Sequence, residues 1–261
     1  MSDNFAWPNF SAEPYTKMLL DWIKSMPSMG DGFFDTFIDV GPGVKNSESY
    51  IVKEYFPDCK IMGFEPHPKR YSNLKSSYPG ELHNTAISSN TGILHGFIDD
   101  DNDPHKQFYT SDIMGSMKNF DMKCTSIDDI IESDSQIKKA IVWADIEGGE
   151  FDMLKGCAKS IMHGKIAGIN LEINFSNKDE LPPGWPLWWE IIHFMRVMGF
   201  APFASSTPGV TSYNSKVYKD LHCLNGYHLN SHNNNPHADF FFMSNIITNE
   251  LDSSYFTVYR D

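Results

Sequence analysis

Three acidic residues stand at the carboxyl ends of short apolar runs, and two glycines follow the first of them. Asp39 precedes Gly41 and Gly43, Glu65 ends a second run, and Asp145 ends a third. In an open parallel sheet, small ligands bind just beyond the carboxyl ends of the strands. Glycine lets the backbone turn sharply and lets a ligand approach it, and the following helix offers free amide donors. We therefore expect a small-molecule site at this edge of a sheet.

The spacing of these residues favours one class of cofactor. Glu65 follows Gly43 by about 20 residues, where an acid can accept hydrogen bonds from both hydroxyls of a ribose. A GxGxxG pyrophosphate loop would require glycine at position 46, where the chain has Asn46. Asp39 beside the loop would repel a pyrophosphate but attract an amino or sulfonium cation. The pattern favours S-adenosylmethionine, with a nicotinamide-dependent oxidoreductase as the alternative.

Alternating strand and helix patterns predict how these residues are positioned. The expected strands are 36–40, 60–65, 82–88, 140–146, 166–175 and 240–243; the expected helices are 11–25, 46–55, 69–77, 126–132, 150–163 and one lined by Trp185, Trp188, Ile192 and Met195 that ends at Gly199. Residues 92–99 are expected as an antiparallel strand and 99–116 as a polar loop, and Ser126 with Asp129 three residues later resembles a helix-capping signature. Right-handed crossovers lay such a series down as a parallel sheet. We predict an α/β/α sandwich around a mostly parallel sheet.

Composition narrows the class of protein further. With 261 residues, of which 41% are hydrophobic, the chain can bury one large core, so we expect a single domain. We divide it into an N-terminal helical extension at 1–33, a cofactor-binding core at 35–175, and a substrate-facing helix, loop and closing strands at 176–261. The net charge of -13 argues against a nucleic acid partner, because phosphate binding needs a surplus of Lys and Arg.

The sequence carries no signal for export or for a membrane span. Four cysteines, Cys59, Cys124, Cys157 and Cys223, lack CxxC spacing and are expected to be reduced thiols. No basic residue precedes an apolar run near the N-terminus, and no apolar run approaches the roughly 20 residues of a membrane-spanning helix. We expect a cytoplasmic protein and leave its oligomeric state open.

A more specific signal lies at residues 143–150, which read WADIEGGE. Together with FIDVG at 37–41, GFEPHP at 63–68 and SIDD at 126–129, this segment resembles the FkbM-type S-adenosylmethionine-dependent methyltransferases over about residues 35–175. The resemblance implies a Rossmann-like seven-strand class I methyltransferase fold. It also implies an O-methyltransferase, acting often on sugars of glycans or glycosylated natural products, so that a small molecule or a glycan is the expected substrate.

The resemblance assigns roles to the candidate residues. It implies that Asp39, Gly41 and Gly43 hold the amino-acid part of the cofactor and that Glu65 holds the ribose. It implies that Asp145 and Glu147 face the methyl-transfer site, with Asp145 also beside the cofactor. His67 follows Glu65 closely and is expected at the edge of the cofactor.

The chain departs from the family pattern at two places. Pro42 and Gly43, followed by Lys45, stand where the family usually has Ala-Asn and another glycine, and Trp143 stands where it usually has Lys. These departures leave a second alternative open, a protein that binds S-adenosylmethionine or acts as a scaffold without catalysis.

Methyl transfer to a sugar hydroxyl requires that the hydroxyl lose its proton. Such a hydroxyl is too weak an acid to ionise unaided at neutral pH, so a general base or a metal is required. We group Asp145, Glu147 and Glu172 as candidate catalytic residues, with Asp145 as the first candidate base. Asp145 and Glu172 holding Mg²⁺ is the alternative, because oxygen ligands suit that ion. Two acids fall short of a recognisable metal site, so no metal ligands are assigned.

Two further groups of residues have alternative interpretations. His228, His232 and His237 with Asp239 match no closed zinc site, and the Asn- and His-rich segment 225–239 is predicted to be a lid or substrate loop. Trp188 and Trp189 give a sugar a stacking platform or pack in the core, and their helical spacing with Ile192 favours the core.

Overall fold

The computed structural model describes residues 12–25, 33–43, 47–98, 108–109, 117–174, 179, 181–182, 184–204, 222–223, 237–244 and 257–258. The predicted loop segments 99–107, 110–116 and 225–236, including His228 and His232, lie outside the described residues. The last three residues of the predicted loop 225–239 begin a strand, β12 (His237–Ser244).

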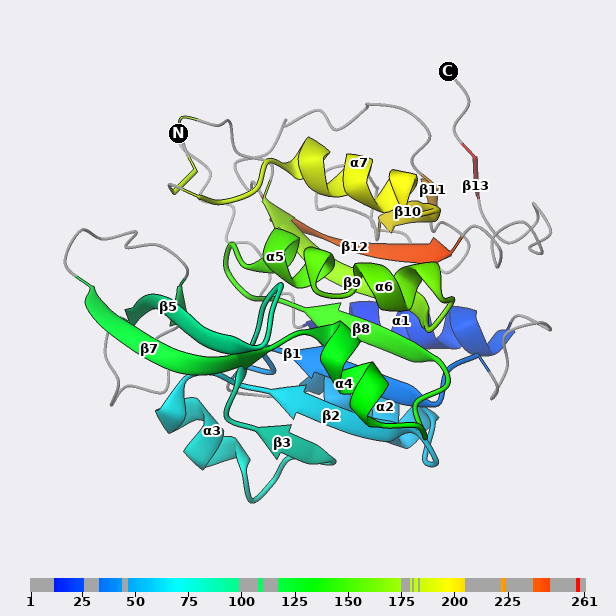
Figure 1. Ribbon diagram of the computed structural model, residues 1–261. Coiled ribbons are helices and arrows are strands. Elements are labelled where there is room, and N and C mark those ends of the chain that lie inside the picture. The colour runs from blue at the N-terminus through cyan, green and yellow to red at the C-terminus, as the bar shows by residue number, and fades with distance from the viewer. Residues whose placement is uncertain are drawn as a thin grey trace, which may run out of the picture.

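The described residues form one large sheet that crosses the molecule (Figure 1). Its strands are β1 (Thr36–Val40), β2 (Lys60–Phe64), β3 (Glu81–His83), β8 (Ala140–Ala144), β9 (Ile166–Asn174), β10 (Phe200–Ala204), β11 (His222–Cys223), β12 and β13 (Thr257–Val258). They lie in the order β13-β11-β10-β12-β9-β8-β1-β2-β3. The run from β3 to β9 is parallel, and β12 is antiparallel to both of its neighbours, β9 and β10. Seven strands from β3 to β10 with one reversed strand confirm the predicted mostly parallel sheet and the class I fold.

Helices cover both faces of this sheet and bury two separate cores. One face carries α1 (Ala12–Ser25) and α2 (Ser47–Tyr55), and the other carries α4 (Ile127–Ser133), α5 (Glu150–Lys155), α6 (Ala158–Met162) and α7 (Trp188–Val197), while α3 (Pro68–Leu74) lies near the β3 edge (Figure 1). All five residues of β1 and all five of β8 are buried, as expected of central strands covered on both faces. Trp143, the departure on β8, packs in the α1 and α2 core with its ring 6.2 Å from that of Phe37.

The predicted strand 82–88 is wrong as a single element, because it divides between two sheets. β3 pairs with β2 in the main sheet, whereas β4 (Ala86–Ile87) pairs with β7 (Lys118–Thr125) in a small sheet. That sheet also holds β5 (Gly92–Ile98) and β6 (Phe108–Tyr109), and the predicted antiparallel strand at 92–99 is confirmed as β5. Between β3 and β4, the Asn84 side-chain amide donates to the carbonyl oxygens of Glu65 at 2.9 Å and Pro66 at 3.0 Å. The chain therefore leaves the main sheet where Asn84 binds the end of β2.

The predicted helix 150–163 is also two elements, α5 and α6, which meet at Gly156 and Cys157. A Cβ on Gly156 would lie 2.2 Å from the Ser88 carbonyl oxygen, so the break lets the helix pack against that backbone. The Asp128 carboxylate accepts hydrogen bonds from the backbone N–H groups of Lys159 and Ser160 and so starts α6. Trp185 lies before α7, outside the helix that the sequence predicted for it.

Other sequence expectations concern single features. The Ser126 side chain accepts from the backbone N–H of Asp129 at 3.0 Å, which confirms it as the N-cap of α4. Cys59, Cys124 and Cys157 are free, buried thiols, as predicted. In the part of the chain that is described, every helix is too short or too polar to cross a membrane.

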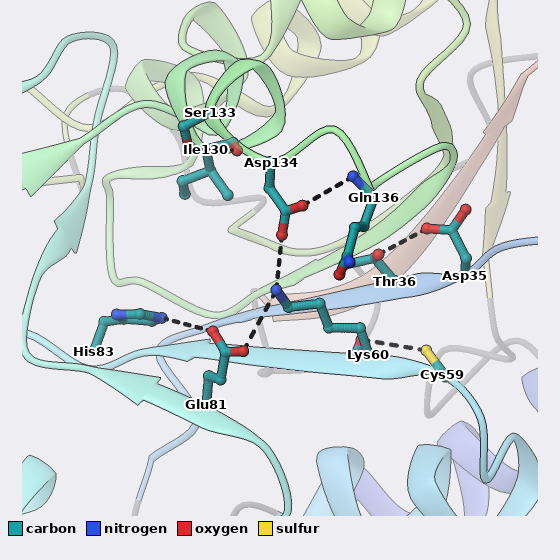
Figure 2. Close-up of polar contacts among 10 residues, drawn as sticks. All are labelled: Asp35, Thr36, Cys59, Lys60, Glu81, His83, Ile130, Ser133, Asp134 and Gln136. Atoms are coloured by element: carbon teal, nitrogen blue, oxygen red, sulfur yellow. Dashed lines mark hydrogen bonds and ion pairs between the residues drawn. The ribbon is translucent and has the colours of Figure 1, made fainter.

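A polar network holds the amino ends of the central strands together (Figure 2). The Lys60 ammonium lies 2.7 Å from Asp134 and 3.4 Å from Glu81, which links β2 to the end of α4 and to β3. The Asp35 carboxylate accepts from the backbone N–H groups of Lys138 and Lys139, both at 3.1 Å. Asp35 thereby joins the start of β1 to the residues just before β8.

We expect Asp35→Ala to destabilise the protein by about 1–2 kcal/mol, because two backbone donors lose a charged acceptor near the surface. Thermal or urea unfolding of the variant measures this loss. Asp58→Ala is the matched control, since Asp58 is exposed and its replacement should leave stability almost unchanged. Equal stability of the two variants would contradict the structural role of Asp35.

Candidate functional site

A cavity of about 210 Å³ lies at the carboxyl ends of β1, β2 and β8. Its walls come from the loops after these strands, from α3 and from the small sheet, whose β5 and β7 extend beyond this edge of the main sheet (Figure 1). The lining residues are Val40, Gly41, Gly43, Phe64, Glu65, Pro66, Arg70, Ala86, Ile87, Leu94, Asp145, Ile146, Glu147 and Gly149. The predicted residues Gly41, Gly43, Glu65, Asp145 and Glu147 thus share one cavity. Sequence reasoning missed Arg70 and the small-sheet residues Ala86, Ile87 and Leu94, because no motif signals which segments pack over a strand end.

The first glycine of the loop, Gly41, makes close backbone contacts with the residues that end β2 and follow β8. Gly41 has φ 79° and donates its N–H to the Phe64 carbonyl at 3.0 Å. A Cβ on Gly41 would lie 2.4 Å from the Asp145 carbonyl oxygen. Gly43 has φ 62°, and the nearest atom to a Cβ there would be 4.0 Å away. Both positions favour glycine because φ is positive, but only at Gly41 do neighbouring atoms also leave no room for a Cβ.

Glu65 offers a buried acceptor at the cavity. The residue is 2% exposed, and its Oε1 accepts from the backbone N–H of His67 at 2.8 Å. Its Oε2 is buried and has no hydrogen-bond partner in the described part of the chain. Burial raises the pKa of this carboxyl to about 7, against the opposing effects of the His67 amide and the Arg70 guanidinium. A ligand with hydroxyl donors would satisfy the unpaired oxygen, as expected for a ribose.

His67 serves the helix beside the cavity. It is fully buried, and its Nδ1 accepts from the backbone N–H groups of Lys69 at 3.2 Å and Arg70 at 3.4 Å, which caps α3. His67 is absent from the residues that line the cavity. Its predicted contact with the cofactor edge therefore stays a prediction, whereas its contact with α3 helps to fix Arg70 at the cavity wall.

Asp39 points away from the cavity into a buried polar cluster. It is 2% exposed, it accepts from the Ser49 hydroxyl, and it accepts from the Tyr78 hydroxyl at 3.0 Å. Burial raises the pKa of Asp39 to about 7, and it also raises the pKa of the Tyr78 phenol, which remains a donor. A Cβ on Gly63 would lie 2.5 Å from the Tyr78 ring, so this glycine makes room for the phenol. Asp39 links the end of β1 to α2 and to the segment after α3, and its predicted contact with the cofactor remains untested.

The turn after β8 carries the candidate catalytic carboxylates. Asp145 is exposed at the cavity, and Glu147 has φ 51°, a left-handed conformation that is unusual for a residue with a side chain. The buried Glu150 accepts from the backbone N–H groups of Ile146 and Gly148 through Oε1, both at 3.3 Å. Burial raises the pKa of Glu150 to about 7. Glu150 therefore holds the turn in the shape that presents Asp145 and Glu147.

Glu172 and Asp145 line different cavities. Glu172 is half-buried on β9 and lines a second, small cavity together with Glu147, Glu150, Asn174, Trp185, Pro186 and Ile191. Asp145 lines only the larger cavity of the two. Within the described residues, no group of three or more His, Cys, Asp or Glu side chains is placed to hold a metal ion. The structure therefore gives no support to Mg²⁺ shared by Asp145 and Glu172.

The remaining candidates lie elsewhere. Trp188 is half-buried against the core of the α4 to α7 face, while Trp189 is 49% exposed, and neither lines a cavity named above. His237 and Asp239 belong to β12, where their backbones pair with Asn174 and Glu172.

Comparisons with known proteins give a family match and several similar solved structures. The profile of the methyltransferase FkbM domain matches residues 39–202. A search of curated proteins finds no significant match. Similar solved structures include a precorrin-6y C5,15-methyltransferase from Geobacter metallireducens GS-15, with 10% identity, coverage of 93% of this chain and 96% of that chain, and a TM-score of 0.42. The plantazolicin methyltransferase BamL, in complex with a triazolic desmethylPZN analog and SAH, has 11% identity, coverage of 88% and 84%, and a TM-score of 0.48. A putative rRNA-methylase from Clostridium thermocellum has 12% identity, coverage of 90% and 99%, and a TM-score of 0.43.

We expect Gly41→Ala to destabilise the protein by about 3 kcal/mol and to abolish binding of S-adenosylhomocysteine, because a Cβ would displace the Asp145 backbone. Gly164→Ala is the matched control. Gly164 has φ 67° but open space around its Cα, so this variant should lose only about 1 kcal/mol and keep its affinity. Denaturant unfolding and calorimetry distinguish the two; similar losses would show that backbone conformation alone matters.

The buried carboxyl of Asp39 predicts a pH dependence of stability. Its folded pKa, about 7, exceeds the ordinary value of 3.8, so the folded chain binds this proton more tightly than the unfolded chain. The free energy of unfolding should therefore fall as the pH rises from about 4 to about 7. Unfolding of Asp39→Asn over the same range should show a shallower fall, whereas Asp58→Asn should follow the wild type. An unchanged slope in Asp39→Asn would contradict the buried proton.

Proposed function

The chain belongs to the FkbM methyltransferase domain family, whose members depend on S-adenosylmethionine, and from this premise we propose that it methylates a hydroxyl of a sugar in a glycan or a glycosylated metabolite. The unpaired Oε2 of Glu65 is the observation that carries the cofactor part of the proposal. A buried acceptor beside a glycine loop fits a ribose with its two hydroxyl donors.

The other walls of the larger cavity fit the same cofactor. Gly43 leaves the backbone open after the end of β1, and Gly41 lines the cavity beside it, where the amino-acid part would lie. Ala86, Ile87 and Leu94 add an apolar wall, which suits a flat aromatic base. When bound, S-adenosylmethionine supplies a methyl group activated by a sulfonium. We assign Gly41, Gly43 and Glu65 to its binding and Asp39 to the support of the loop.

The carboxylates after β8 support a hydroxyl as the acceptor. A positioned carboxylate can take the proton that a hydroxyl loses during methyl transfer. Asp145 and Glu147 both line the cavity, on a turn that Glu150 holds in place, so each can hold this proton on a carboxylate oxygen. Fixing the acceptor oxygen close to these groups supplies much of the rate enhancement. An amine acceptor would have less need of such a base.

The two alternatives make different predictions. A nicotinamide-dependent oxidoreductase is disfavoured by the family membership and by Asn46 in the glycine loop. A scaffold that binds the cofactor without catalysis predicts tight binding of S-adenosylhomocysteine and no turnover on any acceptor.

We expect calorimetric titration with S-adenosylhomocysteine to give micromolar binding that Glu65→Ala weakens by about 1–3 kcal/mol, the usual cost of losing hydrogen bonds to a charged group.

Because the charged form of Glu65 accepts these bonds better, the affinity for S-adenosylhomocysteine should fall about ten-fold as the pH drops from about 8 to about 6. Glu65→Gln should remove this dependence on pH.

Glu54→Ala is the control for these titrations, since Glu54 is an exposed acid on α2. Absence of binding to the wild type, or equal affinity in Glu65→Ala, would overturn the assignment of the cofactor site. The acceptor is then sought by incubating the protein and labelled S-adenosylmethionine with methyl glycosides of common hexoses and deoxyhexoses. A methoxy signal in the product supports O-methylation, and methylation of amines alone would overturn the proposed substrate class.

A further inference from the structure

The second cavity is small, polar and adjacent to the carboxylate turn. Its volume is about 10 Å³, which is roughly the room that one water-sized group needs. Its lining residues include Glu172 and Asn174 from β9 and Trp185 from the segment before α7. Glu147 lines this cavity and the larger cavity as well. A molecule that occupies both cavities must therefore pass this one side chain.

Trp185 presents a donor that the described chain does not satisfy. Its Nε1 is buried and has no hydrogen-bond partner among the described residues. The indole reaches this position because Gly148 has no side chain: a Cβ there would lie 2.4 Å from Nε1. Buried donors are almost always paired in folded proteins, so an unpaired indole N–H on a residue that lines the cavity indicates a missing acceptor.

The group that completes this cavity must accept a hydrogen bond from the indole N–H. A proton on the same group would lie near Glu172 and Asn174, which line the same space. A hydroxyl both accepts and donates, whereas an ammonium has no acceptor and a methoxy oxygen has no donor. The volume admits little beyond the hydroxyl itself.

We propose that this cavity is the subsite for a second hydroxyl of the acceptor, next to the hydroxyl that is methylated. The inference rests on the proposed function, and it specifies the substrate class as a molecule with neighbouring hydroxyls. With one hydroxyl between Trp185 and Glu172, the adjacent hydroxyl lies at Glu147, on the border of the larger cavity.

This placement of the two hydroxyls also distinguishes between Asp145 and Glu147 as the base. Glu147 is held in its left-handed conformation by a turn whose backbone N–H groups at Ile146 and Gly148 bind Glu150. Asp145 lines only the larger cavity and is exposed. Glu147 is therefore the carboxylate that takes the proton from a hydroxyl presented in this way.

The test uses Trp185→Phe, which keeps the aromatic ring and removes the N–H. On a glycoside that the wild type methylates, KM should rise roughly three- to ten-fold with little change in kcat, as expected for one lost hydrogen bond. The preference of the wild type for this glycoside over its analogue without the neighbouring hydroxyl should disappear. Trp189→Phe, at an exposed position on α7, should behave as wild type, and both variants should bind S-adenosylhomocysteine normally. Unchanged KM and unchanged preference in Trp185→Phe would overturn the subsite.

A second measurement does not depend on turnover. In the protein loaded with S-adenosylhomocysteine, the indole N–H resonance of Trp185 is identified by its loss in Trp185→Phe. Titration with cis-1,2-cyclohexanediol or methyl glycosides should shift this resonance to saturation and leave that of Trp189 in place, whereas cyclohexanol should shift it less. If no glycoside is methylated but the resonance shifts, the proposed function fails and the cavity remains a site that binds diols. If methylation occurs and the resonance never shifts, the subsite fails alone.

Discussion

The pairing of β1 with β2 on one side and β8 on the other is the constraint on which the site depends. Val40 pairs with Phe64 and with Ala144, so the next residues along the three strands, Gly41, Glu65 and Asp145, meet at one edge. The backbone then closes further, because Gly41 donates to Phe64 and leaves no room for a Cβ beside the Asp145 carbonyl. The register of a parallel sheet thus brings together a candidate cofactor-binding acid and a candidate base that are far apart in sequence.

Buried carboxyl groups around this edge hold the loops in place through hydrogen bonds. Because their pKa values are raised, the free energy of unfolding falls at higher pH. Asp39, Glu65 and Glu150 are all buried, and burial raises the pKa of each to about 7. Asp39 and Glu150 accept hydrogen bonds from neighbouring groups of the protein, and these bonds hold the loops after β1 and β8 in place. Glu65 keeps one oxygen unpaired at the cavity. Strain and unsatisfied groups concentrated at one site are typical of a binding site prepared for its ligand.

The departures from the family pattern acquire a physical explanation in the fold. Trp143 points into the core of α1 and α2 and contacts Phe37, so it fills a packing position away from the cavity. The loop with Pro42 and Gly43 keeps its left-handed glycines without the family's usual residues. Trp185 lies against Gly148 in the turn after β8 and lines the small cavity there.

The sequence by itself determined the central strands, the acids at their ends and the glycine loop, because these follow from local periodicity and from the rule that parallel strands share one binding edge. It also predicted the N-cap Ser126, which depends on contacts three residues apart. Only the tertiary structure decided that strand 82–88 divides between two sheets, that Asp39 faces Ser49 and Tyr78, and that His67 caps α3. It also decided that Glu172 and Asp145 line different cavities and that Trp185 lies against Gly148. The spacing of residues says which strand end carries a side chain, but the direction of that side chain depends on how distant segments pack against it.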